Sequence, residues 1–413
     1  MTLIRPFTGL RPLPEHAAAV IAPPYDVVTP DEARSRAAGR PWSFLHISRA
    51  EIDLPEGTDP HAPEVYAQAA ASLQRMVTDG ILHRDTQPRY CAYRLTHDEH
   101  TQTGLVAVAS VAAYEAGRIR RHEFTRPDKE DDRVHQIEAL DAQTGPVLLT
   151  YRQSAKVAAY LGEATAADPE FEVTADDGVV HTLWVIRDGA LTERLTAAFD
   201  AMEALYIADG HHRSAAAARV AATRQRQNPD HTGEESYNYF LSVLFPHDQM
   251  RILDYNRVVR DLNGMTPGVF LQRLGEAFRV SEEREPVRPR VTGEFGLYLD
   301  RRWFRLELDP LRIPALDPVG RLDVSLLTDQ ILQPLLGIQD LRRDPRIDFV
   351  GGSRGLRGLM ARVDSGEMAA AFALHPTSME DLMAVADSGE VMPPKSTWFD
   401  PKLADGLVSH VLD

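Results

Sequence analysis

The stretch YIADGHHRSAAAARV, residues 206–220, changes its pattern half-way along. Its apolar start, together with the residues before it, predicts a buried strand that ends at Asp209, and the alanine-rich residues after Ser214 predict a helix. Gly210 stands between the two elements, where a residue without a side chain allows a sharp turn. We therefore expect a strand, a tight turn and a helix whose first turn contains residues 211–214.

A helix that begins in this way suits an anion. Its first backbone amides have no partner within the helix, and they lie at the positive end of the helix dipole. The guanidinium group of Arg213 offers a planar fork of donors for phosphate. His211 and His212 can donate hydrogen bonds or move a proton near neutral pH. We expect Gly210, His211, Arg213 and Ser214 to bind phosphate.

Asp209 has two interpretations. At the end of a strand its carboxylate could bind Mg²⁺ or accept a proton from a hydroxyl nucleophile. The alternative is that Asp209 caps the helix and that the two histidines are ordinary surface groups. Zinc is disfavoured because adjacent histidines point in different directions and the sequence contains no HExxH motif.

The whole composition is that of a soluble globular protein. The 413 residues are enough for two or three domains, with 43% hydrophobic and 26% charged residues. A formal net charge of −16 argues against nucleic acid as a partner, although it leaves room for a local phosphate site. The single cysteine, Cys91, excludes an internal disulfide and suits a reducing cytoplasm. No signal peptide or membrane helix is evident, so we expect a cytoplasmic protein with no membrane partner.

Strand-like and helix-like patterns alternate along the chain, which predicts the α+β class, with mixed sheets and flanking helices. Residues 61–79 have the spacing of an amphipathic helix, and residues 41–48 form a short apolar run that we interpret as a strand. The repeated DSGE segments at Asp364 and Asp387 predict helix ends with a left-handed glycine. A boundary near residue 265 would divide the chain into residues 1–265 and 266–413.

A second charged segment, RRHEFTRPDKEDDR, begins at Arg120, and its proline predicts the start of a helix. His122 and Glu123 precede that helix. We place His122 among the substrate-binding residues, and Glu123 could orient a metal or a substrate amine. Arg126 and Lys129 could hold a second phosphate or a carboxylate. The alternative is a solvated helix with local ion pairs.

Three further side chains are candidates. In APPYD, residues 22–26, the prolines enforce an extended backbone that could aim Asp26 into a cleft, or they could form only a structural turn. Asn256 lies in an otherwise apolar strand and could either bind substrate or be hydrogen-bonded at a sheet edge. Lys395 follows two prolines and could bind phosphate or carboxylate, or lie in an exposed loop. The chain has no Walker A lysine motif and no GxSxG motif.

The order strand, DGHHR, helix resembles the phosphate-binding element of the ParB/sulfiredoxin superfamily. It is similar to that of the free L-serine kinases, whose motif also reads DGHHR. Over nearly its whole length the chain also resembles the family named domain of unknown function 1015. The segments that carry this second resemblance are APPYDVV, HEFTRPDKEDDR, QTGPVLLTYR, YIADGHHR, LDYNRVV, DFVGG and MPPKSTWF. The first resemblance implies a ParB/sulfiredoxin-like catalytic core within residues 1–265.

The kinase resemblance also implies roles for single residues. It places Asp209 and His212 in the chemistry, and Arg213 with the helix amides on the phosphates of a nucleotide. In small serine kinases an acid from the N-terminal part serves as base for the serine hydroxyl, and Asp26 is our candidate for its counterpart. Glu123 completes the catalytic set that we expect.

Two hypotheses follow. The first is Mg²⁺-dependent phosphoryl transfer between ATP or ADP and a small hydroxyl substrate, with free L-serine or O-phosphoserine the best guess and Asp209 the metal ligand. A phosphatase that uses the same site is a close alternative. The second hypothesis is a non-catalytic nucleotide-binding switch or adaptor. The oligomeric state, the nucleotide base and the direction of transfer stay open.

Overall fold

The structure is a computed structural model that describes residues 2–412. The chain forms two compact units: unit 1 comprises Met1–Met250 and Pro401–Asp413, and unit 2 comprises Arg251–Asp400. This division differs from the expected boundary near residue 265. Strand β14 (Tyr255–Val259) pairs only with strands of unit 2 within the described chain, and strand β21 (Ser409–Val411) returns to pair with strands of unit 1.

Within residues 2–412, unit 1 contains a nine-stranded sheet in the order β6-β11-β8-β12-β5-β4-β10-β9, with β1 paired to β5. Its strands are β1 (Ile4–Arg5), β4 (Tyr90–His97), β5 (His100–Ser110), β6 (Ile119–Arg120), β8 (Val147–Tyr151), β9 (Phe171–Thr174), β10 (Val180–Ile186), β11 (Leu205–Asp209) and β12 (Tyr239–Pro246). Strand β11 runs parallel to β6 and antiparallel to β8. The sheet is therefore mixed, which confirms the predicted α+β class.

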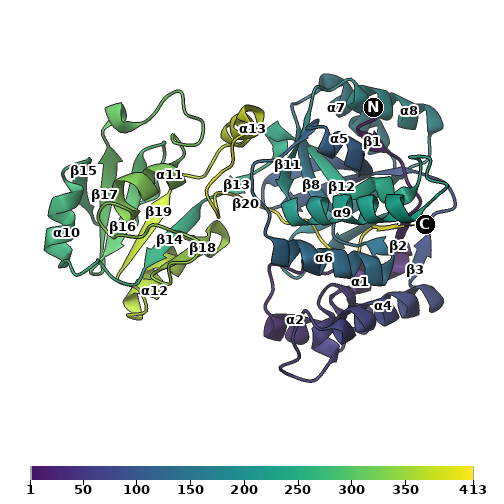
Figure 1. Cartoon of the computed structure of the whole chain (residues 1–413), viewed down its shortest axis with the longest axis horizontal. Helices are drawn as coiled ribbons and strands as arrows, with labels where there is room; N and C mark the ends of the chain where they lie inside the picture. Colours follow the sequence, from purple (N-terminus) through teal and green to yellow (C-terminus); the bar gives the residue numbers. More distant parts are fainter. Residues whose placement is uncertain (1, 413) are drawn as a thin grey trace. The chain divides into compact units, whose positions relative to one another are not determined.

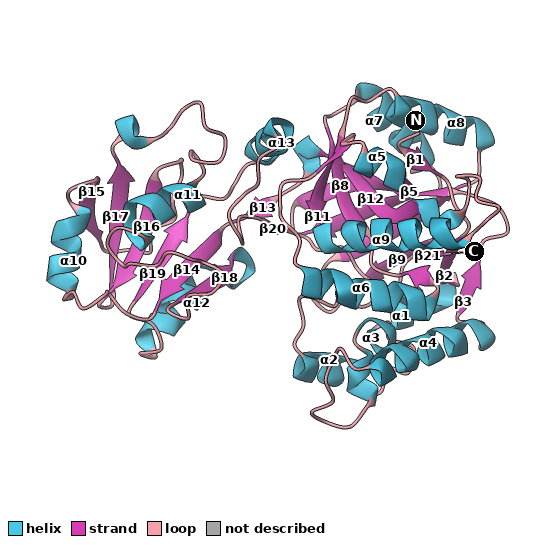
Figure 2. Cartoon of the chain, in the orientation of Figure 1, coloured by secondary structure: helices cyan, strands magenta, loops and turns pink. Residues whose placement is uncertain are grey.

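Helices α5 (Val111–Glu115), α7 (Ala155–Ala164), α8 (Gly189–Asp200) and α9 (His211–Gln227) pack against this sheet through one apolar core. Figure 1 shows α9 crossing the sheet, and Figure 2 shows helix α6 (Pro127–Leu140) alongside it. The two helices pack together through Ile137, Ala216, Val220 and Leu412. The small alanines of α9 allow this close approach, so α9 is held from both sides.

A second core of unit 1 joins helices to a four-stranded sheet in the order β3-β2-β21-β7. The other strands of this sheet are β2 (Gly9–Pro12), β3 (Leu82–Arg84) and β7 (Ala142–Gln143), and the helices are α1 (Ala17–Val20), α2 (Pro30–Ala37), α3 (Leu45–Ser48) and α4 (Pro63–Thr78). Helix α4 confirms the helix predicted for residues 61–79. The C-terminal strand lies inside this sheet, which ties the end of the chain to its beginning.

The strand predicted for residues 41–48 is wrong, because this segment contains the short helix α3. Phe44, Leu45 and Ile47 are all buried in the helical core of unit 1. Short apolar runs satisfy a buried helix and a buried strand equally well, so the neighbouring helices decide between the two.

Unit 2 is built on a six-stranded sheet in the order β15-β17-β16-β19-β14-β18, with every pairing antiparallel. Its further elements are β13 (Ile252–Leu253), α10 (Pro267–Leu274), β15 (Phe278–Glu283), β16 (Glu294–Leu299), β17 (Arg302–Leu308), α11 (Asp323–Leu327), β18 (Ile347–Gly351), α12 (Gly355–Asp364), β19 (Ala370–Leu374), α13 (Met379–Ser388) and β20 (Trp398–Phe399). Gly366 (φ +77°) and Gly389 (φ +74°) follow the ends of α12 and α13, as the DSGE segments predict.

Short helical turns complete the chain: η1 (Pro14–His16), η2 (Ala50–Asp53), η3 (Ser236–Asn238), η4 (His247–Gln249), η5 (Pro310–Arg312), η6 (Thr328–Leu332) and η7 (Gly352–Arg354). Across the described residues, no helix combines the length and the apolar character that crossing a membrane requires.

Candidate functional site

The DGHHR segment leaves the nine-stranded sheet at an edge where three segments meet. Because β6 and β11 are parallel, the residues that follow both strands emerge together, and the start of the antiparallel β8 lies at the same edge. The pairing of β11 with β8 shifts register between Ile207 and Asp209. Gly210 then adopts the left-handed conformation, with φ +98°, and precedes α9.

Helix α9 begins without a cap. Within the described residues, no side chain hydrogen-bonds to its first amides, and its first turn contains no acid. Asp209 instead accepts a hydrogen bond from Lys402, whose Nζ lies 2.9 Å from Oδ2. The alternative that Asp209 caps the helix is therefore wrong, and the amides at the start of α9 keep their capacity to bind an anion.

Two cations converge on Asp209. Besides Lys402, Arg213 places Nη2 3.7 Å from Oδ1 of Asp209, whose side chain is 31% exposed. Burial alone would raise the pKa of Asp209, but the charges of Lys402 and Arg213 hold it well below its ordinary value. Burial opposes the charge on Lys402, yet Asp209 and Asp26 raise the pKa of Lys402 overall. The single negative charge of Asp209 thus faces two cations and the positive end of a helix, which leaves an excess of positive charge at this place.

Two glycines make room for the Arg213 side chain. A Cβ atom on Gly210 would lie 3.0 Å from Nε of Arg213, and a Cβ atom on Gly145 would lie 3.4 Å from its Cδ. Arg213 also donates a hydrogen bond to the carbonyl of Pro146, at the start of β8. The guanidinium group is therefore held against the turn that begins α9.

His211 and His122 form a buried pair of neutral rings. Nε2 of His211 accepts a hydrogen bond from the His122 amide at 3.4 Å, and the two rings meet edge to face with centroids 4.4 Å apart. Burial lowers the pKa of His122 to about 4 and that of His211 well below its ordinary value. Oε2 of Glu123 lies 3.8 Å from Nδ1 of His211. These predicted site residues lie together, and the histidines are uncharged at neutral pH.

His212 faces the start of α6. Its Nε2 accepts a hydrogen bond from the Arg126 amide at 3.1 Å, so its neutral ring carries the proton on Nδ1. Burial lowers the pKa of His212, and the charges of Arg126 and Lys129 act in the same direction. The guanidinium group of Arg126 is paired with Asp128, with Nη2 2.7 Å from Oδ2. The structure thus brings Arg126 and Lys129 close to the DGHHR segment.

Ser214 does not meet the expectation of a phosphate ligand. Its side chain is fully buried, its amide donates to the carbonyl of Gly210, and its hydroxyl donates to the carbonyl of His211 at 3.0 Å. Both groups are therefore used inside the first turn of the helix, which leaves neither for an anion.

The sequence analysis missed Lys402 and Asp405, which arrive with the returning C-terminal segment. Asp405 forms a backbone bridge with Ala22, with hydrogen bonds of 3.0 and 3.2 Å, so the PKLAD and APPYD segments lie side by side. Asp26 is close enough for its charge to raise the pKa of both Lys402 and Asp405. The sequence contained one signal for Lys402. The chain has only four lysines among its 45 basic residues, so a lysine at any position is unusual in this protein.

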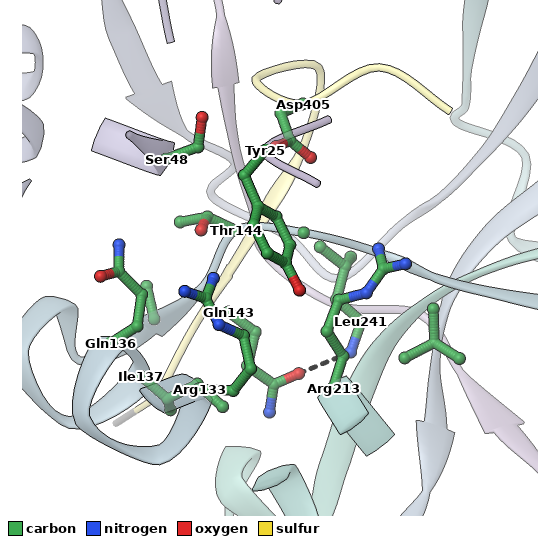
Figure 3. Close-up of a pocket in the computed structure, with 13 residues that line it drawn as sticks. Tyr25, Ser48, Arg133, Gln136, Ile137, Gln143, Thr144, Arg213, Leu241 and Asp405 are labelled. Carbon is green, nitrogen blue, oxygen red and sulfur yellow. Dashed lines mark hydrogen bonds between the residues drawn. The ribbon is translucent and has the colours of Figure 1, made fainter. Parts of the chain in front are cut away.

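A cavity of about 30 Å³ lies beside Arg213. Figure 3 shows the Tyr25 side chain extending between Arg133 and Arg213, with Asp405 nearby. Asp405 is only 2% exposed, and burial, opposed by the charge of Arg213, raises its pKa to about 7. Arg213 therefore belongs both to the turn before α9 and to the wall of this cavity.

Two predicted substrate ligands belong to unit 2. Asn256 is fully buried, its amide group donates to Asp254, and its Oδ1 accepts from the Leu374 amide at 3.0 Å. Lys395 is exposed, and its Nζ lies 5.7 Å from the centre of the Tyr255 ring. The contacts of Asn256 within its sheet favour the structural alternative, and substrate binding by either residue stays a prediction.

Metal binding by protein side chains alone has no support in the geometry. Within the described part of the chain, no group of three His, Cys, Asp or Glu side chains is placed to hold a metal ion. Asp209 is already paired with Lys402. Any Mg²⁺ in this site would need oxygens from a bound ligand as well as from the protein.

Comparison with known proteins identifies the family. The family model described as "Protein of unknown function (DUF1015)" matches residues 4–325, more than three quarters of the chain. The chain belongs to the DUF1015 family. No curated protein sequence matches this DUF1015 protein.

Several solved structures resemble the DUF1015 chain at low identity. A mutant free serine kinase in complex with AMP is 15% identical, with a TM-score of 0.35 over 71% of this chain and 87% of that chain. A conserved hypothetical protein from Pyrococcus furiosus is 14% identical, with a TM-score of 0.34 over 73% and 93%. SbnI with C-terminal truncation from Staphylococcus aureus is 12% identical, with a TM-score of 0.38 over 71% and 82%.

Proposed function

We propose that this DUF1015 protein binds a nucleotide by its phosphates at the start of α9 and transfers a phosphoryl group between that nucleotide and a small hydroxyl substrate. One observation carries the proposal: Lys402 and Arg213 converge on Asp209 at a helix end that no side chain caps. The DGHHR motif, similar to that of the free L-serine kinases, makes free L-serine or O-phosphoserine the first substrate to test.

The cations can be shared with a phosphate at small cost. A partly exposed ion pair such as Lys402–Asp209 contributes about 1 kcal/mol or less to stability. A phosphate group brings up to two negative charges and several acceptor oxygens to the same place. Lys402 and Arg213 can therefore turn toward the ligand while the first amides of α9 bind it directly.

The chemistry of such a site is mainly positioning and charge stabilisation. Mg²⁺, bound through Asp209 together with phosphate oxygens, would supply further positive charge to the transferring group. Asp26 is the proposed base for the substrate hydroxyl, and His212 and Glu123 are the proposed additional catalytic groups. His122 and His211 are buried, and burial lowers the pKa of both, so they carry no positive charge near neutral pH.

Phosphorus NMR tests the proposal. The purified protein is mixed with Mg²⁺ and either ATP with L-serine or ADP with O-phospho-L-serine, and formation of phosphoserine or ATP is followed. We expect turnover that is lost in Asp209→Asn and His212→Ala. Asp168→Asn is the matched control and retains turnover, because Asp168 is exposed and is not one of the residues proposed for the site. Circular dichroism of each variant establishes that it is folded.

Other outcomes have defined meanings. Phosphate released from phosphoserine without any nucleotide would point to a phosphatase at the same site. Nucleotide binding through Arg213 without turnover of any hydroxyl substrate would point to a switch or adaptor. Absence of nucleotide binding would overturn the proposal.

A further inference from the structure

The cavity beside Arg213 contains polar groups that lack partners. Oγ of Ser48 lines it and is buried without a hydrogen bond. Within the described residues, the Tyr25 hydroxyl and Nη1 of Arg133 also have no hydrogen-bond partner. A buried polar group without a partner costs about 1–3 kcal/mol. The Ser48 hydroxyl is such a group, and the partly exposed side chains of Tyr25 and Arg133 line the same small space, so the three together can bind a ligand there.

Arg133 is held rigidly in the cavity wall. Its Nε and Nη2 lie 3.0 and 2.6 Å from one oxygen of Asp132, and its guanidinium carbon lies 4.1 Å from the centre of the Tyr25 ring. Asp132 is itself anchored, because it accepts hydrogen bonds from Tyr66 at 2.8 Å and from His61 at 2.9 Å. These contacts leave Nη1 as the remaining edge of the guanidinium group, already oriented for a ligand.

Several side chains in the cavity wall can donate hydrogen bonds. Ser48, Tyr25 and Arg133 can each donate a hydrogen bond. Asp405 is the carboxyl group in the wall, and burial raises its pKa to about 7, so near neutral pH it is protonated in about half of the molecules and can also donate. The complementary ligand is a small group rich in acceptors and negatively charged. A carboxylate, with two oxygens and about four lone-pair sites, has this character.

We infer that the cavity binds the carboxylate of the acceptor substrate through Arg133, Tyr25 and Ser48, which makes the substrate class small hydroxy acids, hydroxylated amino acids included. This inference rests on the proposed function, since Arg213 lines both the cavity and the phosphate site. It excludes neutral alcohols and sugars as good substrates.

Calorimetric titration of the full chain, with and without ADP, tests the inference on matched pairs of probes. L-serine is compared with serinol, and glycolate with ethylene glycol, so that each pair differs by a carboxylate. We expect each carboxylate to bind at least about tenfold more tightly than the partner that lacks it, as the loss of one charge-assisted hydrogen bond predicts. Equal binding within both pairs, in the presence and in the absence of ADP, overturns the inference.

Variants identify the groups that hold the carboxylate. Arg133→Met and Tyr25→Phe should each weaken carboxylate binding about tenfold and leave ADP affinity unchanged. Arg194→Met is the matched control, because Arg194 also lies over a tyrosine, 4.8 Å from the Tyr160 ring, and pairs with Glu163, but at the surface. Tyr25→Phe removes one hydroxyl only, so it decides the case if Arg133→Met, which leaves Asp132 unpaired, does not fold.

The two proposals can fail separately. Carboxylate selectivity without nucleotide binding would leave the cavity site standing and remove the proposed kinase. Nucleotide binding with unchanged carboxylate affinity in both Tyr25→Phe and Arg133→Met would remove the cavity site and leave the phosphate site in place.

Discussion

Helices α6 and α9 lie against each other, yet their first turns have opposite chemistry. Neither helix has a side-chain cap among the described residues. The first turn of α6 contains Asp128 and Glu130, whereas that of α9 contains no acid and follows the glycine at position 210. An acid in the first turn typically stabilises a helix by about 0.3–1 kcal/mol. The acids in its own first turn stabilise helix α6 in this way, whereas helix α9 has no acid in its first turn.

The difference extends to the cations. Arg126, before α6, is paired with Asp128 from the same turn. Arg213 and Lys402, at the start of α9, share Asp209 between them. Cations at the positive end of a helix oppose the dipole. The comparison teaches that the first turn of α6 contains the acids that complement a helix dipole, while the first turn of α9 contains none and has two cations nearby.

The largest expected effect is a change of the unfolding free energy with pH, caused by Asp405 near the start of α9 and contrasted with Asp128 in α6. A hydrogen bond from Arg126 lowers the pKa of Asp128, whereas burial raises that of Asp405 from 3.8 to about 7. The folded state therefore binds the Asp405 proton more tightly, so stability from this group is present at acid pH and is lost as the pH rises toward 7. Relative to Asp405→Asn, the wild-type unfolding free energy should fall by on the order of 3 kcal/mol from pH 5 to pH 8.

Hydrogen exchange of unit 1 peptides at each pH measures this change. The groups that face Asp405 and titrate or carry charge are Arg213, Asp26 and Arg133. Asp323→Asn is the control, because burial also raises the pKa of Asp323 to about 7 in unit 2. That variant should alter the pH dependence of unit 2 and not that of unit 1. A wild-type unit 1 with the same pH dependence as Asp405→Asn would contradict the prediction.

Lys402→Met should give the next largest effect. It removes one of the two cations at the start of α9, so we expect ADP to bind at least about tenfold more weakly, the value of one charge-assisted hydrogen bond. Calorimetry measures the affinity. Lys156→Met is the matched control, since Lys156 is exposed on α7 and should not affect binding. Unchanged affinity in Lys402→Met would show that α9 binds anions, if at all, without this lysine.

Gly210→Ala should destabilise the turn before α9 by more than a left-handed backbone alone explains. Gly117 also has a positive φ, +73°, but a Cβ atom there would meet nothing within 4 Å. At Gly210 the same atom would approach three atoms of the Arg213 guanidinium group at 3.0–3.1 Å. We expect Gly117→Ala to cost about 1 kcal/mol and Gly210→Ala about 1 kcal/mol more. Hydrogen exchange of peptides from β11 and β6 would report equal losses if Arg213 simply moved aside.

The smallest effect comes from exchanging the two helix starts. His212→Asp gives α9 an acid at the position that Asp128 occupies in α6, and Asp128→His does the reverse. An added acid should stabilise α9 by about 0.3–1 kcal/mol and weaken ADP binding two- to fivefold, in the range of a helix-dipole interaction. Asp128→His should leave ADP affinity unchanged. Calorimetry and thermal unfolding of both variants test the pair, and tighter ADP binding by His212→Asp would refute the electrostatic interpretation.

Local patterns predicted much of the architecture. The strand before Asp209, the left-handed turn at Gly210, helix α9 and the glycine ends of α12 and α13 all follow from short-range preferences of the residues concerned. The apolar run at residues 41–48 predicts a strand, but the segment contains helix α3. The prediction is wrong because a short apolar run does not distinguish a strand from a buried helix. The boundary between the units was misplaced because strand pairing, not local composition, assigns β14 to unit 2.

The sequence by itself determined the element that matters most: an apolar strand, a glycine and a basic, acid-free helix start that together favour an anion. Only the tertiary structure decided what stands around it. Lys402 and Asp405 lie about 190 residues further along the chain and reach Asp209 and Arg213 because β21 pairs inside the sheet of the N-terminal segment. Long-range pairing leaves no local pattern, and it is this pairing that places charged partners and a small cavity beside the start of α9.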